Sequence, residues 1–326
     1  MNNELNLLPA LGIDVSKDYF HVELGLAEKK RNRKFTNRAE GFAELAVWLG
    51  KQQVPQAHVC LEATGSYSEE LALYLHQQGH YVSVVNPVRI KAFGQSELLR
   101  NKDDRPDAGL IKRFCETQRP ARWTPPAAEL RQLQALTRHL AGLIETRQQQ
   151  LNRLESARSK EVVRSLRKLV IYLDKEIAQA EKQIKGHIEQ HPDLQQQYEL
   201  LDSIKGLGAR TISILLGEIN FKQYRSARQV AAHVGLTPRN ERSGTLQHKT
   251  RMSKIGNARV RKALFMPALV AKRHNPVVRS FSARLAANGK SKMAIIGAAM
   301  RKLIHIAFGV LKSGQPFDPH YELKNA

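Results

Sequence analysis

Four acidic residues in the N-terminal third of the chain are candidates for a divalent metal site. Asp14 lies in an alternating apolar segment, Glu62 ends a short apolar run, and Asp104 and Asp107 lie in NKDDRPDA. Pro106 suits the first turn of a helix, so Asp104 and Asp107 would lie on one helix edge. Gathered carboxylates repel one another unless a cation neutralises them, and Mg²⁺ is the usual cation beside phosphate oxygens. Together the four predict metal-assisted chemistry at phosphorus, although each alone also fits a helix cap or a turn.

Ser243 is a candidate nucleophile because it precedes Gly244 in a loop rich in cations. Those cations are Arg239, Arg242, Lys249, Arg251 and Lys254. They would bind a scissile phosphate and stabilise the transition state, while the serine hydroxyl attacks phosphorus and forms a phosphoserine ester. Ser-Gly is also a common turn dipeptide, so the loop alone leaves both interpretations open. Ser253 is a second serine in this region, and we expect it to cap the helix that follows.

Two further segments have the character of phosphate-binding elements. Gly206 and Gly208 in IKGLGA match the hairpin of a helix-hairpin-helix unit, where backbone N–H groups approach DNA phosphates. The alternative is a tight turn between two helices. Arg259, Arg261 and Lys262 lie on the edge of the next predicted helix and would contact backbone phosphates.

The distribution of charge supports a nucleic-acid partner. The chain has 326 residues, a formal net charge of +22 and a sequence pI of about 10.2. Residues 1–110 hold 13 Lys and Arg against 14 Asp and Glu, whereas residues 242–317 hold 16 Lys and Arg and no carboxylate side chain. A long basic stretch of this kind predicts salt-sensitive binding to phosphates, with a ribosome-like or acidic-protein-binding surface as the alternative.

Membrane insertion and secretion are not expected. We find no apolar run near the ~18 residues that span a bilayer, and the N-terminus has no signal-peptide pattern. Only two cysteines, Cys60 and Cys115, are present, too few for a disulfide framework or a thiolate metal cluster. These features favour the cytoplasm.

The N-terminal segment predicts a layered α/β domain. Residues 10–26 favour a β-hairpin, and KFTN at 34–37 a third strand. A helix over 39–50, a strand over 57–63, a helix after Gly65 and a strand from Tyr81 follow. The order gives mixed strand directions, unlike a nucleotide-binding sheet.

Two long helices are expected after a proline-punctuated linker at 119–127. The second has apolar residues at steps of three or four, namely Leu166, Val170, Leu173, Ile177, Ala180, Ile184 and Ile188. This spacing predicts a coiled coil or a helical hairpin, packed within the chain or against another copy. The expected domains are 1–126, 127–195 and 196–326, the last mostly α-helical.

The motifs GIDVSKD, CLEATGSY, NKDDRPDA, IKGLGARTISILLGEI and GLTPRNERSGT together resemble the DEDD transposases of bacterial insertion sequences, which are related to the Piv DNA invertases. The resemblance implies a RuvC-like domain with an RNase H fold, a coiled-coil region, and a C-terminal domain with a helix-hairpin-helix. It matches Asp14, Glu62, Asp104 and Asp107 to the family's four acids, and Ser243 to its nucleophile. Asp103 offers a competing register that the family's D-x-x-D pattern excludes.

The resemblance also implies cofactors and partners. It implies Mg²⁺, with Mn²⁺ as an alternative, at the acidic site and a covalent serine linkage to DNA. The partners would be double-stranded element and target DNA, and a structured non-coding bridge RNA of the kind that guides some family members. A homo-oligomer, dimer or tetramer, would bring two DNAs together at the bacterial nucleoid.

Two other functions remain open at this point. One is a RuvC-like hydrolytic endonuclease or junction resolvase, in which water attacks and Ser243 is a turn residue. The other is a non-catalytic scaffold that binds DNA or RNA, with the carboxylates serving as caps and salt-bridge partners.

Overall fold

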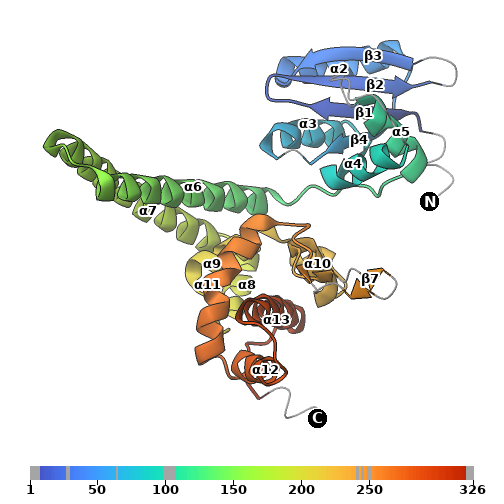
Figure 1. Cartoon of the computed structure of the whole chain (residues 1–326). Helices are drawn as coiled ribbons and strands as arrows, with labels where there is room; N and C mark the ends of the chain where they lie inside the picture. Colours follow the sequence, from blue (N-terminus) through green and yellow to red (C-terminus); the bar gives the residue numbers. More distant parts are fainter. Residues whose placement is uncertain are drawn as a thin grey trace. The chain divides into compact units, whose positions relative to one another are not determined.

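The computed structural model divides the chain into two compact units, Met1–Pro125 and Pro126–Ala326. The structure describes residues 8–26, 30–63, 65–97, 108–239, 242–243, 246–247 and 251–320. Each unit is described by itself below. The helices α6 and α7 and all that follows them belong to the second unit (Figure 1).

A five-stranded mixed sheet forms the centre of the first unit. Its strands are β1 (Ala10–Val15), β2 (Tyr19–Gly25), β3 (Lys30–Thr36), β4 (His58–Glu62) and β5 (Tyr81–Val85), in the order β3-β2-β1-β4-β5. The strands β1, β2 and β3 pair antiparallel, whereas β1, β4 and β5 pair parallel. The predicted α/β arrangement with mixed directions is confirmed, and it is compatible with a RuvC-like domain.

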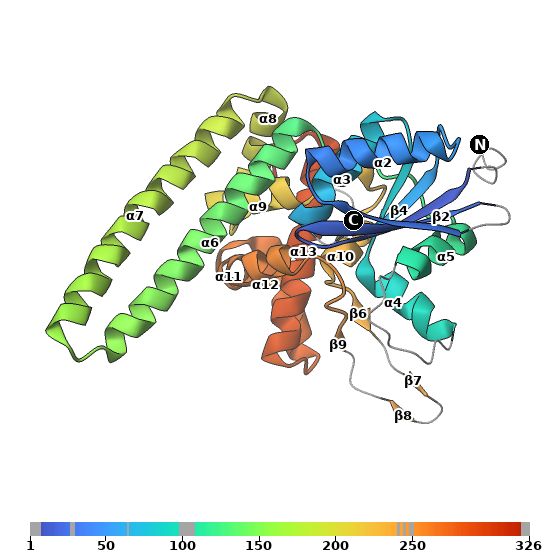
Figure 2. The ribbon, with the colours of Figure 1, turned by 90° about the horizontal axis from the view of Figure 1, so that it is seen from above.

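Helices cover both faces of this sheet. The helices α2 (Ala39–Lys51) and α3 (Ser66–Gln77) lie on one face, and α4 (Pro87–Ser96) and α5 (Ala108–Gln118) on the other (Figure 2). Because strand residues alternate between faces, Leu11 and Ile13 pack toward α2 and α3, while Ala10 packs toward α5. The residues of β1 therefore belong to two separate apolar clusters.

A long helical hairpin begins the second unit. The helices α6 (Ala128–Ser156) and α7 (Lys160–Glu189) run antiparallel and contact each other along their length (Figure 2). The buried residues of α7 are the seven predicted from its spacing: Leu166, Val170, Leu173, Ile177, Ala180, Ile184 and Ile188. The helical hairpin is thus confirmed, while coiled-coil geometry stays a prediction.

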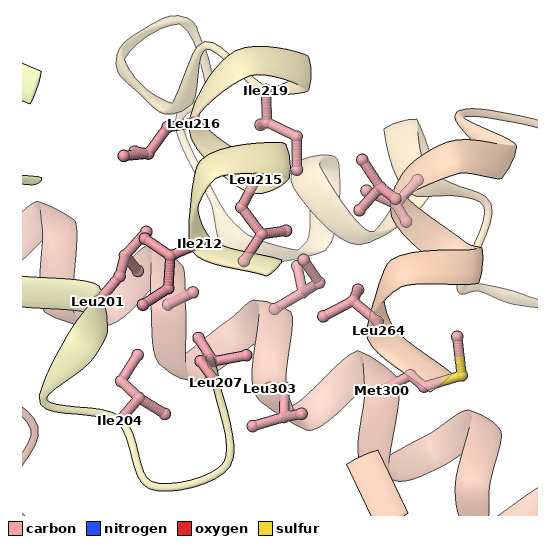
Figure 3. Packing of buried hydrophobic residues seen from close by; sticks show 14 of the residues in the cluster. Leu201, Ile204, Leu207, Ile212, Leu215, Leu216, Ile219, Leu264, Met300 and Leu303 are labelled. Atoms are coloured by element: carbon pink, nitrogen blue, oxygen red, sulfur yellow. The ribbon is translucent and has the colours of Figure 1, made fainter. Parts of the chain in front are cut away.

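A bundle of shorter helices completes the second unit. It comprises α8 (Pro192–Asp202), α9 (Ala209–Glu218), the 3₁₀ turn η1 (Phe221–Gln223), α10 (Ala227–Val234), α11 (Ala258–His274), α12 (Pro276–Ala287) and α13 (Lys292–Ser313). Leu215 of α9, Leu264 of α11 and Leu303 of α13 meet in one apolar core (Figure 3). The prediction of a mostly helical C-terminal region is correct.

The helix α13 is apolar enough over an 18-residue window, and long enough, to cross a membrane by length and composition alone. Half of that window is buried in the fold, where α13 contacts α8, α10, α11 and α12. No unbroken apolar run marks this stretch in the sequence, because Lys and Arg interrupt it. Its apolar residues serve the core of the second unit.

Candidate active site and nucleic-acid interface

Asp14 and Glu62 lie at the same end of two neighbouring parallel strands. Ile13 of β1 is opposite Leu61 of β4, so the two acidic residues follow at one level. Both side chains are half-buried, and alternation places them on the sheet face that carries Gly12. Two of the four predicted carboxylates therefore lie side by side on the face that α5 covers.

The approach of α5 to β1 depends on Gly12. A Cβ atom at Gly12 would lie 2.2 Å from the carbonyl oxygen of Ala108 and 2.3 Å from the backbone nitrogen of Lys112. Ala108 is the first residue of α5 and follows Asp107 directly. The first turn of α5 therefore packs against β1 at Gly12, which is two residues before Asp14.

Asp104 and Asp107 themselves lie outside the described residues, as does Asp103. Within the described part of the chain, no group of three or more His, Cys, Asp or Glu side chains is gathered as a metal would require. Asp14 and Glu62 lie together, but their role as metal ligands stays a prediction, as does that of Asp104 and Asp107.

A buried lysine beside this face was not predicted from the sequence. Lys112 of α5 is 4% exposed, and its Nζ lies 3.4 Å from Glu23 Oε1 and 3.5 Å from Glu116 Oε1. Glu23 lies opposite Gly12 in the pairing of β1 with β2. In the sequence Lys112 lies where the helix spacing favours an exposed side chain. Only the close approach of α5 to β1 at Gly12 buries it.

Ser243 lies near the end of a two-stranded ribbon in the second unit. The strand β7 (Arg242–Ser243) pairs antiparallel with β8 (Leu246–Gln247), with Ser243 opposite Leu246. Nearer the bundle, β6 (Pro238–Arg239) pairs with β9 (Arg251–Met252). The sequence predicted a loop here, and the structure adds two short pairs of strands, one of which includes Ser243 (Figure 2). Lys249 lies outside the described residues.

Backbone hydrogen bonds anchor the base of this ribbon to α10. The amide of Ser253 donates to the carbonyl of Thr237 at 2.8 Å, and that of Lys254 to Gly235 at 3.2 Å. Gly235 has φ +76° and ends α10, and a Cβ there would meet the carbonyl oxygen of Ile255 at 2.7 Å. Only glycine combines this left-handed conformation with so close a neighbour.

A buried carboxylate holds the helix that follows the ribbon. Glu218 accepts from Arg138 Nε at 2.7 Å and from Asn257 Nδ2 at 2.8 Å, and its side chain is 3% exposed. Burial raises the pKa of Glu218, but the hydrogen bonds from Arg138 and Asn257 and the charges of Arg138 and Arg259 outweigh it, so its pKa is lowered. The carboxylate therefore stays ionised and orients Asn257.

Asn257 is the cap of α11, in place of the predicted Ser253. Its side-chain oxygen accepts from the amides of Arg259 and Val260, at 3.0 and 3.2 Å. Ser253 lies four residues before Asn257, in the turn that precedes α11. Its hydroxyl accepts a hydrogen bond from the amide of Ile255 at 3.4 Å. The prediction of Ser253 as the helix cap was wrong.

The predicted basic residues of α11 have different surroundings. Arg259 and Lys262 are exposed, and Lys262 Nζ lies 3.9 Å from Glu145. Arg261 is half-buried, and its Nη1 donates to the carbonyls of Val234 at 2.7 Å and Gly256 at 3.0 Å. Arg261 therefore also fastens α11 to the end of α10.

The two glycines between α8 and α9 also differ. Gly206 has φ +111°, and a Cβ there would lie 2.8 Å from that of Ala271. Gly208 precedes α9 as its cap residue, with no atom within 4 Å of an added Cβ. Gly206 thus permits packing on α11, whereas Gly208 leaves the N-terminus of α9 open. Ile204 and Leu207 point into the core from this turn (Figure 3).

Comparison with known proteins identifies the family of the chain. A family model of IS110-type DEDD transposases matches residues 11–158, and the model described as "Transposase IS116/IS110/IS902 family" matches residues 198–283. The pilin gene-inverting protein of Moraxella bovis is 33% identical over 319 residues, which cover 94% of this chain and 97% of that protein. The chain belongs to this transposase family.

Other relatives agree with this assignment. The transposase for insertion sequence element IS1328 of Yersinia enterocolitica is 26% identical over 80% of this transposase and 83% of its own length. The transposase for IS1111A of Coxiella burnetii is 23% identical over 81% of the chain and 78% of its own length. The protein is a DNA transposase/recombinase, and membership of the family implies that it binds DNA.

Proposed function

We propose that this transposase cuts and rejoins DNA through Ser243, with Mg²⁺ or Mn²⁺ held by Asp14, Glu62, Asp104 and Asp107. The observation that supports the acidic site most is the pairing of β1 with β4, which brings Asp14 and Glu62 to one level. The packing of Ala108 against Gly12 adds to it, because the chain enters α5 directly from Asp107.

The donors on β1 and β4 suit a hard divalent cation. Carboxylate oxygens are what Mg²⁺ prefers, Asp14 and Glu62 offer them at adjacent strand ends, and phosphate oxygens of the DNA would be further ligands. The metal would withdraw charge from the phosphate oxygens in the transition state. Asp14 and Glu62 would position it.

The proposed bond changes are balanced within the protein and the DNA. The Ser243 oxygen attacks phosphorus and loses its proton, while the bond from phosphorus to one sugar oxygen breaks. That oxygen takes up a proton and leaves as a hydroxyl, and the DNA end stays attached as a phosphoserine ester. Arg239, Arg242 and Arg251 would stabilise the charged phosphorus centre. Attack by a DNA hydroxyl on the ester releases Ser243 and rejoins the strands.

A denaturing gel tests this chemistry. Purified protein is incubated with element-junction DNA, Mg²⁺ and RNA transcribed from the non-coding flank of the element. We expect a protein-linked DNA band that is lost in Ser243→Ala and in Asp14→Asn and retained in Ser253→Ala, the matched serine control. Cleavage that survives Ser243→Ala without an adduct would instead establish a hydrolytic nuclease. Binding without any cleavage would favour a scaffold.

The nucleic-acid partners in this proposal are double-stranded element and target DNA and a structured bridge RNA. The acid-free stretch 242–317 supports contact with phosphates, and the open N-terminus of α9 at Gly208 supports a helix-hairpin-helix contact. Arg259 and Lys262 would add backbone contacts, with Arg261 and Lys254 beside them. RNA that copurifies and protects the protein from proteolysis would support the guide, and binding to chromosomal DNA would place the protein at the nucleoid.

We further propose that the protein self-associates through a coiled-coil domain, residues 127–195. Along the sequence this domain follows the catalytic domain, 1–126, and precedes the C-terminal domain, 196–326. Large apolar side chains on α7 are exposed: Val162 by 45%, Leu169 by 39%, Ile171 by 57% and Tyr172 by 57%. A dimer or tetramer would cover them. Mixing Asp14→Asn with Ser243→Ala protein restores the adduct if one subunit supplies the carboxylates and another the serine.

Site-specific inversion is a second candidate outcome of the same chemistry. It is favoured by the likeness to the pilin gene-inverting protein over 94% of the chain. A plasmid with two recombination sites in opposite orientation separates the two functions. Inversion of the intervening segment would support an invertase, and excision with insertion elsewhere would support a transposase.

A further inference from the structure

Part of the sheet in the first unit is left open on the side that α5 covers. The helix α5 packs mainly on β1, β2 and β4, and six of the seven residues of the edge strand β3 are exposed. A cavity of about 400 Å³ lies on this open part. Its lining includes His21, Glu23, Asn32, Lys34 and Ala108.

The strand register connects this cavity to the acidic residues. His21 of β2 is opposite Asp14 of β1, and Lys34 of β3 is opposite His21. One cross-strand row therefore runs from Glu62 through Asp14 and His21 to Lys34, on a single face. Since adjacent strands are about 4.8 Å apart, Lys34 lies about 10 Å from Asp14 along the row.

The side chains on this open part have the chemistry of a nucleic-acid strand platform. Tyr19 is 44% exposed, and Lys34 Nζ lies 3.9 Å from the centre of its ring. His21 and Asn32 add hydrogen-bonding groups. Glu23, the acidic residue in the lining of the cavity, is paired with Lys112. An exposed aromatic ring beside a cation is how proteins stack the bases of single strands and hold their phosphates.

The charge of β3 is concentrated relative to its surroundings. The segment KRNRKFT holds four cations and no acid, whereas the whole of residues 1–110 has one more acid than base. Charged edge strands also prevent pairing between sheets, and Arg31 on the opposite face of β3 suits that purpose. Such protection explains neither the cavity nor the tyrosine beside Lys34.

We propose that Tyr19, His21, Asn32 and Lys34 bind a single-stranded segment of the DNA next to the phosphate that is cut. A stacking ring can reach bases only where they are unpaired, which favours a locally opened strand over an intact duplex. DNA is favoured over RNA because the row leads to the carboxylates that act on DNA. The placement of this segment next to the cut phosphate rests on the proposed function of Asp14 and Glu62. The binding of single-stranded DNA by Tyr19 and Lys34 does not depend on that function.

Photo-crosslinking of the full-length protein tests this site. A single-stranded DNA oligonucleotide containing 4-thiothymidine is irradiated with the protein in EDTA, so that no cleavage occurs, and the attached peptides are mapped by mass spectrometry. We expect attachment at Tyr19 in addition to attachment in the basic C-terminal region. Lys34→Glu should lower the yield at Tyr19 about five- to tenfold through loss of one contact and added repulsion.

Arg31→Glu is the matched control, because it reverses a charge on the same strand but on the other face. It should leave the yield at Tyr19 within about twofold, since its charge is screened from the site. Attachment confined to the C-terminal region, or equal losses in both variants, would overturn the proposal. A higher yield with RNA or with the same DNA as a duplex would overturn the assigned partner. Because the assay needs no catalysis, attachment at Tyr19 stands even if Ser243→Ala proves active.

Discussion

Replacing Gly12 by alanine should push α5 away from the sheet. The added Cβ would lie 2.2 Å from the Ala108 oxygen, 2.3 Å from the Lys112 nitrogen and 2.8 Å from the Lys112 Cα. All three are backbone atoms, so no rotamer change relieves the contact. Ordinary contact begins near 3.4 Å, so the helix or the strand must move by about 1.2 Å.

The cost should be close to that of overpacking a core, about 1–3 kcal/mol. Separation of α5 from β1 would also weaken the contacts of Ile111, Phe114 and Cys115 in the small cluster beneath it. We expect the free energy of unfolding of the first unit to fall by about 2–3 kcal/mol. Adduct formation should fall further, because a shift of about 1 Å in a catalytic group can cost about a hundredfold in rate.

Tryptophan fluorescence during urea titration measures this change in the first unit. The two tryptophans of the chain, Trp48 and Trp123, both belong to that unit. Gly50→Ala is the matched control, because Gly50 lies in α2 with no atom within 4 Å of an added Cβ. It should stabilise the unit by up to about 1 kcal/mol. An unchanged urea midpoint in Gly12→Ala would show that α5 and β1 accommodate the added Cβ without the expected displacement.

Four other perturbations have definite expected outcomes. Glu218→Ala should destabilise the second unit by about 1–3 kcal/mol in a circular dichroism titration, since it leaves the partly exposed Arg138 and the Asn257 amide without their acceptor. Because the pKa of Glu218 is lowered in the folded protein, the ionised carboxylate stabilises the fold above its unfolded pKa of about 4.3. This stability is lost as the pH falls through the folded pKa. Glu218→Gln should therefore make the free energy of unfolding depend less steeply on pH on the acid side. Cys60 and Cys115 should resist alkylation in the native protein, because both are buried and the pKa of Cys115 is raised by its hydrogen bond with Cys60 and by burial. Arg259→Ala should lower the salt slope of DNA binding by about one unit if it contacts one phosphate.

The order of elements in the first unit could be predicted because each has a strong local signal. Alternation gave β1 and β2, and the run HVCLE gave β4 with Glu62 at its end. The third strand was predicted over 34–37, whereas β3 begins at Lys30. Its first residues are all polar and exposed, and backbone pairing with β2 makes them a strand, so no apolar pattern marks its start.

The features that position the sites could not be read locally. Ser253 and Asn257 are both good cap residues, and only the hydrogen bond from Asn257 to the distant Glu218 selects the second. Lys112 resembles a surface lysine until Gly12 admits α5 and brings Glu23 against it. In each case the deciding partner is far away in sequence, so propensity and periodicity have no access to it.

The two candidate halves of the active site rest on separate cores. Within the described residues, the clusters that support β1 and β4 lie in the first unit, and the cluster that supports the ribbon of Ser243 lies in the second. In the proposed mechanism Ser243 and the carboxylates must act on one phosphate, because a serine far from the metal cannot cut. We therefore expect a Ser243 adduct to form only when protein and DNA are assembled together.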